Sequence, residues 1–593
     1  MARAADSGAA SPAPLARFDS LDPLRGARSF RFGGLRGVVR ADSLGQVVPA
    51  MRAVEEAVAA GRHAAGFVAY EAAPAFDPAL ATRPPDPRLP LAWFAVYDRR
   101  EEVDPEEEEP APGDFELGEW RVETGEDAYR ANVGRIRELI AAGDTYQVNY
   151  TVRMRAPFGG SDLALYERLR RAQRSAFCAY LRFDETAVVS ASPELFFRWE
   201  GGELELRPMK GTRPRGRWPA EDAALAAELV ASPKERAENL MIVDLLRSDA
   251  GRVSEFGSVR VERLFEAERY ETVHQLTSTI RSRTRPGATL ADVFRALFPC
   301  GSVTGAPKVR TSQIIAEVED APRGVYTGAV GFASPGEAVF SVAIRTVVVD
   351  LAAGVAELGV GSGITFDSDA AAEYRECLAK AAFTRRAPND FRLLETLLWE
   401  PGAGFFLLDG HLARLAESAA YFGFRCDVEE ARRRLHACAS AAPALPHRVR
   451  LTLDRAGAVE VACEPLGAPD EPVRVAVAGE PVDSREPLLY HKTTRREVYE
   501  RAAASRPDCG DVLLVNERGE LTESTIASLV VEMDGARWTP PLQSGLLPGV
   551  FRAELLRRGE VRERVLRPDD LARAYAVWLV NSVRRWRRAT LIA

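Results

Sequence analysis

Hydrophobic and polar residues follow two different periods along this chain. Residues 203–207 (Glu-Leu-Glu-Leu-Arg) alternate with a period of two, which predicts a half-buried strand. Short apolar strands separated by turns are expected between residues 18 and 99. Helical spacing of apolar residues predicts helices at 44–60, 129–142, 221–247 and 371–383. Strands and helices mixed in this way indicate an α/β (α+β) protein.

Two charged residues stand out against this pattern. The strand at 203–207 is followed by a segment bounded by proline and glycine, Arg207 to Gly216, which is predicted to be a loop that exposes Lys210 to a ligand. A lysine in a basic loop is more often an ordinary surface residue, so both interpretations stay open at this point. Residues 187–197 are predicted to be a strand with one acidic residue, Glu194. Such a carboxylate is either paired or has a raised pKa, which would suit a general acid.

Composition limits the class of protein. A chain of 593 residues is too long for one ordinary domain, and 46% hydrophobic with 28% charged residues is typical of a soluble globular protein. The net charge of -8 gives no basic surface for nucleic acid, and no apolar run approaches the roughly 20 residues of a membrane span. Seven cysteines without a Cys-x-x-Cys pair favour reduced thiols in the cytoplasm and argue against disulfides or a zinc site.

The chain is expected to form two domains. Residues 1–14 are rich in Ala, Ser and Pro and are predicted to be disordered, without the apolar core of a signal peptide. Residues 101–113 are acidic and punctuated by proline, which predicts a solvated loop. Residues 385–390 resemble a linker, after which strand and helix patterns begin again. The predicted domains are therefore 15–384 and 391–593.

Two glycine-rich segments superficially resemble nucleotide-binding motifs. Residues 298–309 form a turn that opens a helix, but Lys308 is followed by Val309, so the segment is not a P-loop. Free N–H groups at such a helix start still suit an anion. Residues 359–363 (Gly-Val-Gly-Ser-Gly) lack the strand–turn–helix unit of a dinucleotide site, so that interpretation is rejected.

Carboxylates on two helices raise the question of a metal site. Glu238 shares a helix face with apolar Ile242 and Leu245, and Glu373 and Glu376 share a face of a later helix. Magnesium prefers a few carboxylates combined with water and substrate oxygens. For each glutamate taken alone, a salt bridge is the preferred interpretation.

Motifs in the first domain resemble those of a known family. Pro208-Met209-Lys210-Gly211-Thr212 resembles the Pro-Ile-Lys-Gly-Thr motif of aminodeoxychorismate synthases, chorismate-using enzymes of folate synthesis, whereas the related anthranilate synthases have alanine at the lysine position. Gln147 matches a position where the water-adding relatives carry a lysine base, which favours the ammonia-using branches. The resemblance implies an α/β sandwich of two orthogonally packed sheets. It implies catalytic Lys210, Glu194 and His274; chorismate contacts at Gly211, Thr212, Ser302, Thr304, Tyr326, Arg345, Gly361, Ser362, Gly363 and Lys380; and Mg²⁺ ligands Glu238 and Glu376.

The second domain resembles fold-type-IV pyridoxal-phosphate enzymes, which include aminodeoxychorismate lyase, branched-chain aminotransferase and D-amino-acid aminotransferase. That family has two α/β subdomains. Lys492 matches its cofactor lysine, Arg414 its phosphate arginine and Glu523 the partner of the pyridine nitrogen. The other implied cofactor contacts are Ser524, Thr525, Gly549, Val550 and Ser582. Ser528 and Phe551 replace the usual Asn and Thr, which leaves the choice between lyase and transaminase open.

The two resemblances together imply synthesis of 4-aminobenzoate, a folate precursor. The first domain would convert chorismate and ammonia to aminodeoxychorismate, and the second would release pyruvate from that product with pyridoxal 5'-phosphate. No Gly-x-Cys-x-Gly elbow of a glutaminase occurs around any cysteine, so a separate glutamine amidotransferase chain is expected as partner. A homodimer through the second domain is compatible with the resemblance. The alternatives are an anthranilate synthase fused to an aminotransferase, and a non-catalytic scaffold.

Overall fold

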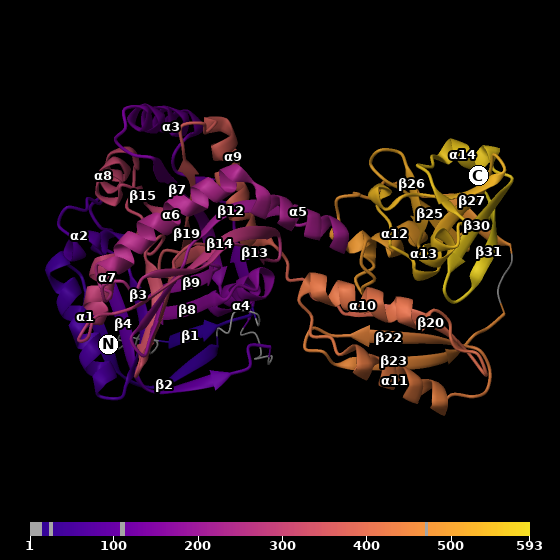
Figure 1. The fold of residues 1–593 in the computed structure, drawn as a ribbon, viewed down its shortest axis with the longest axis horizontal. Helices are drawn as coiled ribbons and strands as arrows, with labels where there is room; N and C mark the ends of the chain where they lie inside the picture. The colour runs from indigo at the N-terminus through magenta and orange to yellow at the C-terminus, as the bar shows by residue number, and fades with distance from the viewer. Residues whose placement is uncertain (1–14, 23–27, 107–112, 469–471, 593) are drawn as a thin grey trace, which may run out of the picture. The chain divides into compact units, whose positions relative to one another are not determined.

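The computed structural model describes residues 15–22, 28–106, 113–468 and 472–592, which form two compact units (Figure 1). Unit one comprises residues 1–214 and 226–389, and unit two comprises residues 215–225 and 390–593. The predicted disorder of residues 1–14 lies outside the described residues. Among the described residues, no helix is both long and apolar enough to cross a membrane.

Unit one is built on a mainly antiparallel sheet whose successive pairings form two halves. The first half runs β14 (Val273–Arg283), β11 (Glu203–Arg207), β10 (Leu195–Glu200), β17 (Glu337–Val342), β16 (Ala329–Ser334), β3 (His63–Val68), β4 (Ala92–Val103) and β2 (Ser29–Ala41). The second runs β1 (Leu15–Asp19), β8 (Phe177–Phe183), β9 (Thr186–Ser192), β18 (Thr346–Asp350), β19 (Val355–Ile364) and β7 (Gln147–Gly160). Strand β1 also pairs with β2 and so joins the halves.

Side-chain alternation along the strands separates three cores. In β4, Phe94 packs in one core while Trp93 and Tyr97 pack in another, as the period of two requires. The core with Trp93 draws on strands of both halves and therefore lies between two sheet layers. The outer faces are covered by α1 (Leu44–Ala59), α2 (Ala73–Phe76), α6 (Pro233–Gly251) and α7 (Leu290–Leu297) on one half and by α3 (Glu126–Ala141), α4 (Asp162–Gln173), α8 (Lys308–Val318) and α9 (Ala370–Ala381) on the other (Figure 1). The expectation of a two-sheet α/β sandwich is confirmed.

The predicted helix at 221–247 is wrong in one respect, because it is two helices. Helix α5 (Pro219–Ala231) ends before Ser232, and α6 begins at Pro233. The Ser232 hydroxyl accepts a hydrogen bond from the Glu235 backbone N–H at 3.4 Å, so it caps α6, and proline is favoured at the first helical position. This Ser-Pro pair was the sequence signal for the break.

One strand prediction and two loop predictions also need correction. The predicted strand 187–197 divides into β9 and β10, with Pro193 and Glu194 between them. The predicted loop after residue 207 contains β12 (Met209–Pro214), because these residues pair with β14. The predicted acidic loop 101–113 begins inside β4, where Glu101–Val103 pair with β2; residues 107–112 lie outside the described part.

Unit two has two α/β subdomains. The first is the sheet β21 (Gly404–Phe405), β20 (Leu393–Glu400), β22 (His447–Leu453) and β23 (Val459–Pro465), which shares a core with α10 (Leu408–Phe422) and α11 (Val428–Ala441) (Figure 1). The second sheet contains β26 (Leu521–Ser524), β25 (Asp511–Val515), β24 (Val473–Val477), β31 (Arg585–Leu591), β30 (Ala576–Asn581), β27 (Ser528–Met533), β28 (Ala536–Thr539) and β29 (Arg562–Glu563). Its helices are α12 (Glu497–Ser505), α13 (Val550–Arg557) and α14 (Pro568–Arg573).

The remaining strands of unit one are β5 (Phe115–Leu117), β6 (Arg121–Val122) and β15 (Gly305–Ala306), together with β13 (Arg260–Arg269), which pairs with β14.

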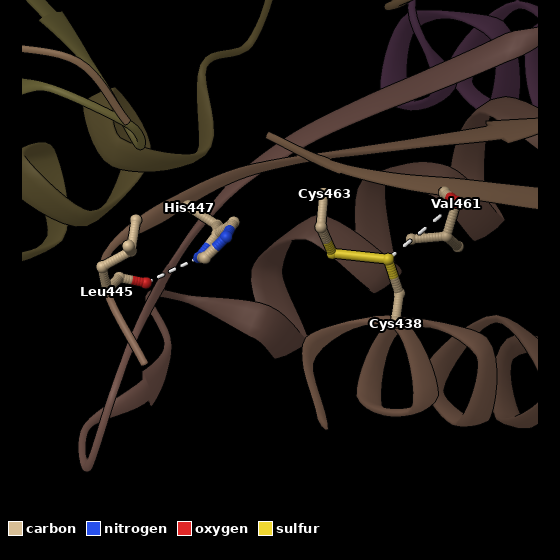
Figure 2. Close-up of a disulfide and its surroundings, with 5 residues drawn as sticks. All are labelled: Cys438, Leu445, His447, Val461 and Cys463. Carbon is tan, nitrogen blue, oxygen red and sulfur yellow. Dashed lines mark hydrogen bonds between the residues drawn. A yellow bond between two sulfur atoms is a disulfide. The ribbon is translucent and has the colours of Figure 1, made fainter. Parts of the chain in front are cut away.

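One pair of cysteines departs from the expectation of reduced thiols. Cys438 on α11 and Cys463 on β23 form a disulfide (Figure 2). Their separation of 25 residues gave no sequence signal, but the packing of α11 on the sheet brings their Cα atoms to 6.5 Å, within disulfide range. Cys178, Cys300, Cys377, Cys426 and Cys509 are free.

Residues 215–225 belong to unit two, although the sequence placed them in the first domain. The Arg215 guanidinium lies over the Tyr421 ring at 4.2 Å, and the Tyr421 hydroxyl donates to the Gly216 carbonyl at 2.7 Å. The Trp218 ring packs against Tyr490 at 5.1 Å between centroids. This segment is therefore part of the packing of unit two.

Candidate active sites

Three residues from separate strands meet in unit one. Lys210 lies on β12, where the register with β14 shifts between Met209 and Thr212. Gly363 lies near the end of β19, and Gln147 opens β7. A Cβ atom added to Gly363 would lie 2.6 Å from Gln147 Nε2 and 2.7 Å from Lys210 Nζ. The glycine therefore leaves space that both polar side chains border.

Gln147 is fully buried, and neither polar atom of its side chain has a hydrogen-bond partner among the described residues. A buried amide without partners costs free energy, and this cost is removed when a polar ligand binds. The position beside Lys210 is thus suited to a polar substrate.

Burial lowers the pKa of Lys210, which favours its neutral, nucleophilic amine. Glu238, Glu194 and Glu376 oppose this shift and Lys380 adds to it, so all of these charges lie within electrostatic reach of Lys210. The structure thus brings together predicted residues from β12, α6, α9 and the β9–β10 connection.

Glu194 is 3% exposed and lies where the chain turns from β9 into β10. Burial raises its pKa to about 7, although the Ser302 hydroxyl, which donates to Oε1 at 2.7 Å, lowers it. A carboxyl group with a pKa near neutrality can hold a proton at physiological pH and release it. Glu194 therefore has the properties of a general acid.

The predicted magnesium ligands lie on two helices. Glu238 on α6 forms an ion pair with Lys234, with 3.9 Å between Oε1 and Nζ. Glu376 on α9 forms an ion pair with Lys380, with 2.8 Å between Oε1 and Nζ. Lys380 Nζ also donates to the Gly361 carbonyl at 2.7 Å. Within the described residues no cluster of three or more His, Cys, Asp or Glu side chains could hold a metal. Glu238 and Glu376 both lie within electrostatic reach of Lys210, and carboxylates combined with water or substrate oxygens are the ligands that Mg²⁺ prefers.

The other predicted chorismate contacts have protein partners in the structure. The Thr212 side chain is exposed and donates to Gln275 Oε1 at 3.0 Å, and Arg345 donates to Gln173 Oε1 at 2.9 Å. His274 is buried in β14 opposite Arg213. The Thr304 hydroxyl donates to the Cys300 carbonyl, and the hydroxyls of Ser362 and Tyr129 are hydrogen-bonded at 3.3 Å. The Tyr326 ring packs directly against Gly359. These contacts involve neither Lys210 nor Glu194.

In unit two, Lys492 and Arg414 share a buried network. Burial, followed by Arg414, lowers the pKa of Lys492 to about 8. The Arg414 guanidinium donates to both Glu395 oxygens, at 2.9 and 2.6 Å, and to the Pro548 carbonyl at 3.1 Å. Burial opposes ionisation of Glu395, but Arg414 and His411 still lower its pKa to about 2. Glu395 thus fixes the arginine.

Glu523 is 5% exposed on β26. Its Oε1 accepts hydrogen bonds from the Tyr499 hydroxyl at 2.9 Å and from the Leu547 N–H at 3.1 Å. Burial raises the pKa of Glu523 to about 7, although these two hydrogen bonds lower it.

The remaining predicted cofactor residues are Ser524, Thr525, Gly549, Val550 and Ser582. Asp511 accepts hydrogen bonds from the Ser524 and Thr525 hydroxyls at 2.7 and 2.6 Å. Gly549 caps α13, Val550 packs beside Gly410 of α10, and Ser582 is buried. Because Asp511 occupies both hydroxyls, Ser524 and Thr525 are held by the protein itself.

Sequence reasoning missed Glu395, Tyr499 and Asp511. Glu395 carried the same signal as Glu194, a single acidic residue in an apolar strand, Leu393 to Leu397. Asp511 and Tyr499 carried no signal, since each acts through partners distant in sequence.

The donor set of unit two fits pyridoxal 5'-phosphate. Lys492 is a buried amine with a lowered pKa, Arg414 is a fixed cation, and Glu523 keeps one oxygen, Oε2, that accepts no hydrogen bond from the described residues. A carbonyl, a phosphate and a pyridine nitrogen are the groups that such side chains bind.

Comparison with known families defines the class of protein. The chorismate binding enzyme family matches residues 33–386, and amino-transferase class IV matches residues 392–592. The chain belongs to the chorismate-binding enzymes and carries a class IV aminotransferase domain at its C-terminal end.

Individual relatives agree with this assignment. An aminodeoxychorismate synthase of Streptomyces pristinaespiralis is 49% identical over 44% of this chain and 36% of its own length. Aminodeoxychorismate synthase component 1 of Klebsiella aerogenes is 41% identical over 50% of this chain and 63% of its own length. The crystal structure of anthranilate synthase component I from Streptococcus pneumoniae is 26% identical, with a TM-score of 0.54 over 61% of this chain and 93% of that one. The chain thus spans between 36% and 63% of these two synthases.

Proposed function

We propose that this chain makes 4-aminobenzoate from chorismate in two steps. Unit one converts chorismate and ammonia to 4-amino-4-deoxychorismate, and unit two eliminates pyruvate from that product. Relatives named aminodeoxychorismate synthase support the first step, and the class IV aminotransferase domain supports the second.

The observation that carries the proposal is the position of Lys210. Its Nζ borders the same space as the unpartnered Gln147 amide and Gly363, close to the carboxyl group of Glu194. Anthranilate synthases, by resemblance, have alanine in place of this lysine. A buried amine in that space supports covalent catalysis of the amination at C4.

The first step uses Lys210 as a nucleophile and Glu194 as an acid. The neutral Lys210 amine bonds to ring carbon C2 while both ring double bonds shift and the C4 hydroxyl leaves as water with the Glu194 proton. Ammonia then bonds to C4, both double bonds shift back, and the C2–N bond to Lys210 breaks, which releases the neutral amine. The new ammonium group at C4 returns one proton to the Glu194 carboxylate. Each displacement is easier than a direct exchange of hydroxyl for amine, which is the usual advantage of a covalent intermediate.

Glu238 and Glu376 would hold Mg²⁺ in unit one. When bound, the ion would neutralise a substrate carboxylate beside Lys210.

The second step depends on Lys492, Arg414 and Glu523. Pyridoxal phosphate, when bound, supplies an electron sink for the elimination of pyruvate. Arg414, fixed by Glu395, binds its phosphate group, and Glu523 orients its ring nitrogen. The Lys492 amine, with a pKa of about 8, accepts the substrate ring proton whose loss makes the product aromatic.

Ammonia would come from a separate glutamine amidotransferase chain. The sequence contains no glutaminase elbow, and the expected setting is the cytoplasm. Addition of such a chain should let glutamine replace ammonium salts in the first step.

The deciding experiment is incubation of the purified chain with chorismate, an ammonium salt, Mg²⁺ and pyridoxal phosphate, followed by chromatography. The expected product is 4-aminobenzoate, with aminodeoxychorismate accumulating when pyridoxal phosphate is removed. Formation of 2-aminobenzoate would instead identify an anthranilate synthase. Absence of both products with intact substrate would support the scaffold alternative.

A further inference from the structure

The carboxylate of Glu523 uses its two oxygens differently. Oε1 accepts two hydrogen bonds, from the Tyr499 hydroxyl at 2.9 Å and from the Leu547 backbone N–H at 3.1 Å. No described residue donates to Oε2. The protein thus saturates one oxygen and leaves the other for a ligand donor.

Tyr499 is held in place from two sides. It lies on α12, which begins shortly after Lys492, and the Arg496 guanidinium lies over its ring at 4.6 Å. Arg496 is itself tied to the Thr525 carbonyl at 2.5 Å. The tyrosine therefore cannot leave Glu523 without breaking this stack.

The Tyr499 hydroxyl can act only as a donor in this contact. Burial and the nearby Glu523 raise the pKa of Tyr499 well above its ordinary value, so the phenol keeps its proton. A donor to a carboxylate stabilises the charged form over the neutral acid. Loss of this donor would favour a proton on Glu523.

We propose that Tyr499 is a positioning residue that keeps Glu523 charged and directs its Oε2 to the protonated ring nitrogen of pyridoxal phosphate. This inference rests on the proposed function, since it requires that cofactor. With Tyr499 in place, the proton shared between Glu523 and the ring nitrogen stays on the nitrogen. The chain thereby sets the electron-withdrawing strength of the ring through a residue outside the predicted cofactor contacts.

The test is the ¹⁵N chemical shift of the ring nitrogen in full-length protein loaded with ring-labelled pyridoxal phosphate. The parent should show a protonated nitrogen at neutral pH. In Tyr499→Phe, the ratio of protonated to unprotonated nitrogen should fall by about tenfold, the effect expected for one hydrogen bond to a charged group. Pyridoxal phosphate should still bind, which shows that unit two of the variant is folded, and aminodeoxychorismate synthesis in unit one should stay at the parental rate.

A double-mutant cycle separates positioning from packing. In a Glu523→Gln background, Tyr499→Phe should change the ¹⁵N shift no further, because the carboxylate through which it acts is gone. An unchanged shift in Tyr499→Phe alone, with cofactor bound, would overturn the inference and leave the proposed function standing. A parent protein that binds no pyridoxal phosphate would overturn both.

Discussion

Buried carboxyl groups in both units have pKa values raised to about 7, Glu194 in unit one and Glu523 in unit two. The same physical cause, removal from water, serves different roles in each place. In the proposed function, Glu194 gives up a proton during the reaction, whereas Glu523 stays charged. Each carboxylate accepts one backbone N–H hydrogen bond, from Met209 for Glu194 and from Leu547 for Glu523, and the two differ in the side-chain donor, which is the Ser302 hydroxyl for Glu194 and the Tyr499 phenol for Glu523.

The acid role of Glu194 predicts a pH dependence. Only the protonated form can donate, so the rate of aminodeoxychorismate formation should fall as pH rises above about 7. Glu194→Gln should lower this rate by about 10²–10⁴-fold and remove the alkaline limb of the pH profile. Stopped assays across pH 6–9 would measure both. A variant that retains the parental limb would exclude Glu194 as the titrating acid.

The two lysines should separate the two reactions. Lys210→Ala should reduce aminodeoxychorismate formation by about 10³-fold or more, the scale of a lost covalent route, while conversion of supplied aminodeoxychorismate continues. Lys492→Ala should give the reverse, with aminodeoxychorismate accumulating and the visible absorbance of bound cofactor lost. Chromatography of both variants, each with an active separate lyase added back, measures the outcome. Parental 4-aminobenzoate formation by Lys492→Ala would show that unit two is not the lyase.

At the scale of secondary-structure elements, the close approach of β7, β12 and β19 depends on Gly363. A methyl group there would collide with Gln147 Nε2 and Lys210 Nζ. Gly363→Ala should therefore reduce aminodeoxychorismate formation by about tenfold or more while the unfolding temperature changes little, because side chains rather than backbone must move. Gly159→Ala on β7, where a Cβ has open space, is the matched control. Equal effects of the two substitutions on activity would contradict this account of the site.

The helices α6 and α9 each present one proposed metal ligand. Glu238→Gln and Glu376→Gln should each raise the magnesium concentration needed for half-maximal synthase activity by about tenfold or more, since a neutral amide replaces an anionic ligand. Glu373→Gln is the control on α9, because Glu373 accepts a hydrogen bond from Ser368 at 2.8 Å. Magnesium titrations that coincide with the parent for both variants would reject the assignment.

The sequence predicted those elements whose signals are local. The helix 44–60 is α1, apart from its last residue, and the strand 203–207 is β11. The strand at Lys210 could not be predicted, because β12 exists through pairing with β14, a strand distant in the sequence, with Met209 opposite Thr277 and Pro214 opposite Val273. In the site, single residues with a motif could be named, whereas Tyr499 and Asp511 could not, because their partners are brought close only by folding.

At the scale of the whole molecule, unit two includes a segment from the middle of the first domain. Trp218 packs on Tyr490 and joins the cluster of Val482, Leu489 and Leu514. Trp218→Ala should destabilise unit two by roughly 2 kcal/mol, about half the cost for a fully buried tryptophan. Calorimetry of the full chain should show a lower unfolding temperature for unit two and an unchanged unfolding temperature for unit one. Equal shifts of both transitions would argue against this placement.

The same segment affects a fragment of residues 390–593. Such a fragment would lack the Arg215 guanidinium and the Gly216 carbonyl that contact Tyr421, whose ring lies 4.3 Å from that of His491, next to Lys492. Unit two is therefore incomplete when the chain is divided at the linker. If the chain were divided into two genes, the gene for unit two would have to encode residues 215–225 as well.

The order of synthesis on the ribosome has a further consequence. Residues 215–225 leave the ribosome long before residue 390 is added, yet their packing partners lie beyond that residue. At roughly 5–20 residues per second, the segment waits on the order of ten seconds before those partners exist. During that interval the ring of Trp218 has no Tyr490 to cover it. Completion of unit two thus ties together two stretches of chain made at different times, and unit one can finish folding in between.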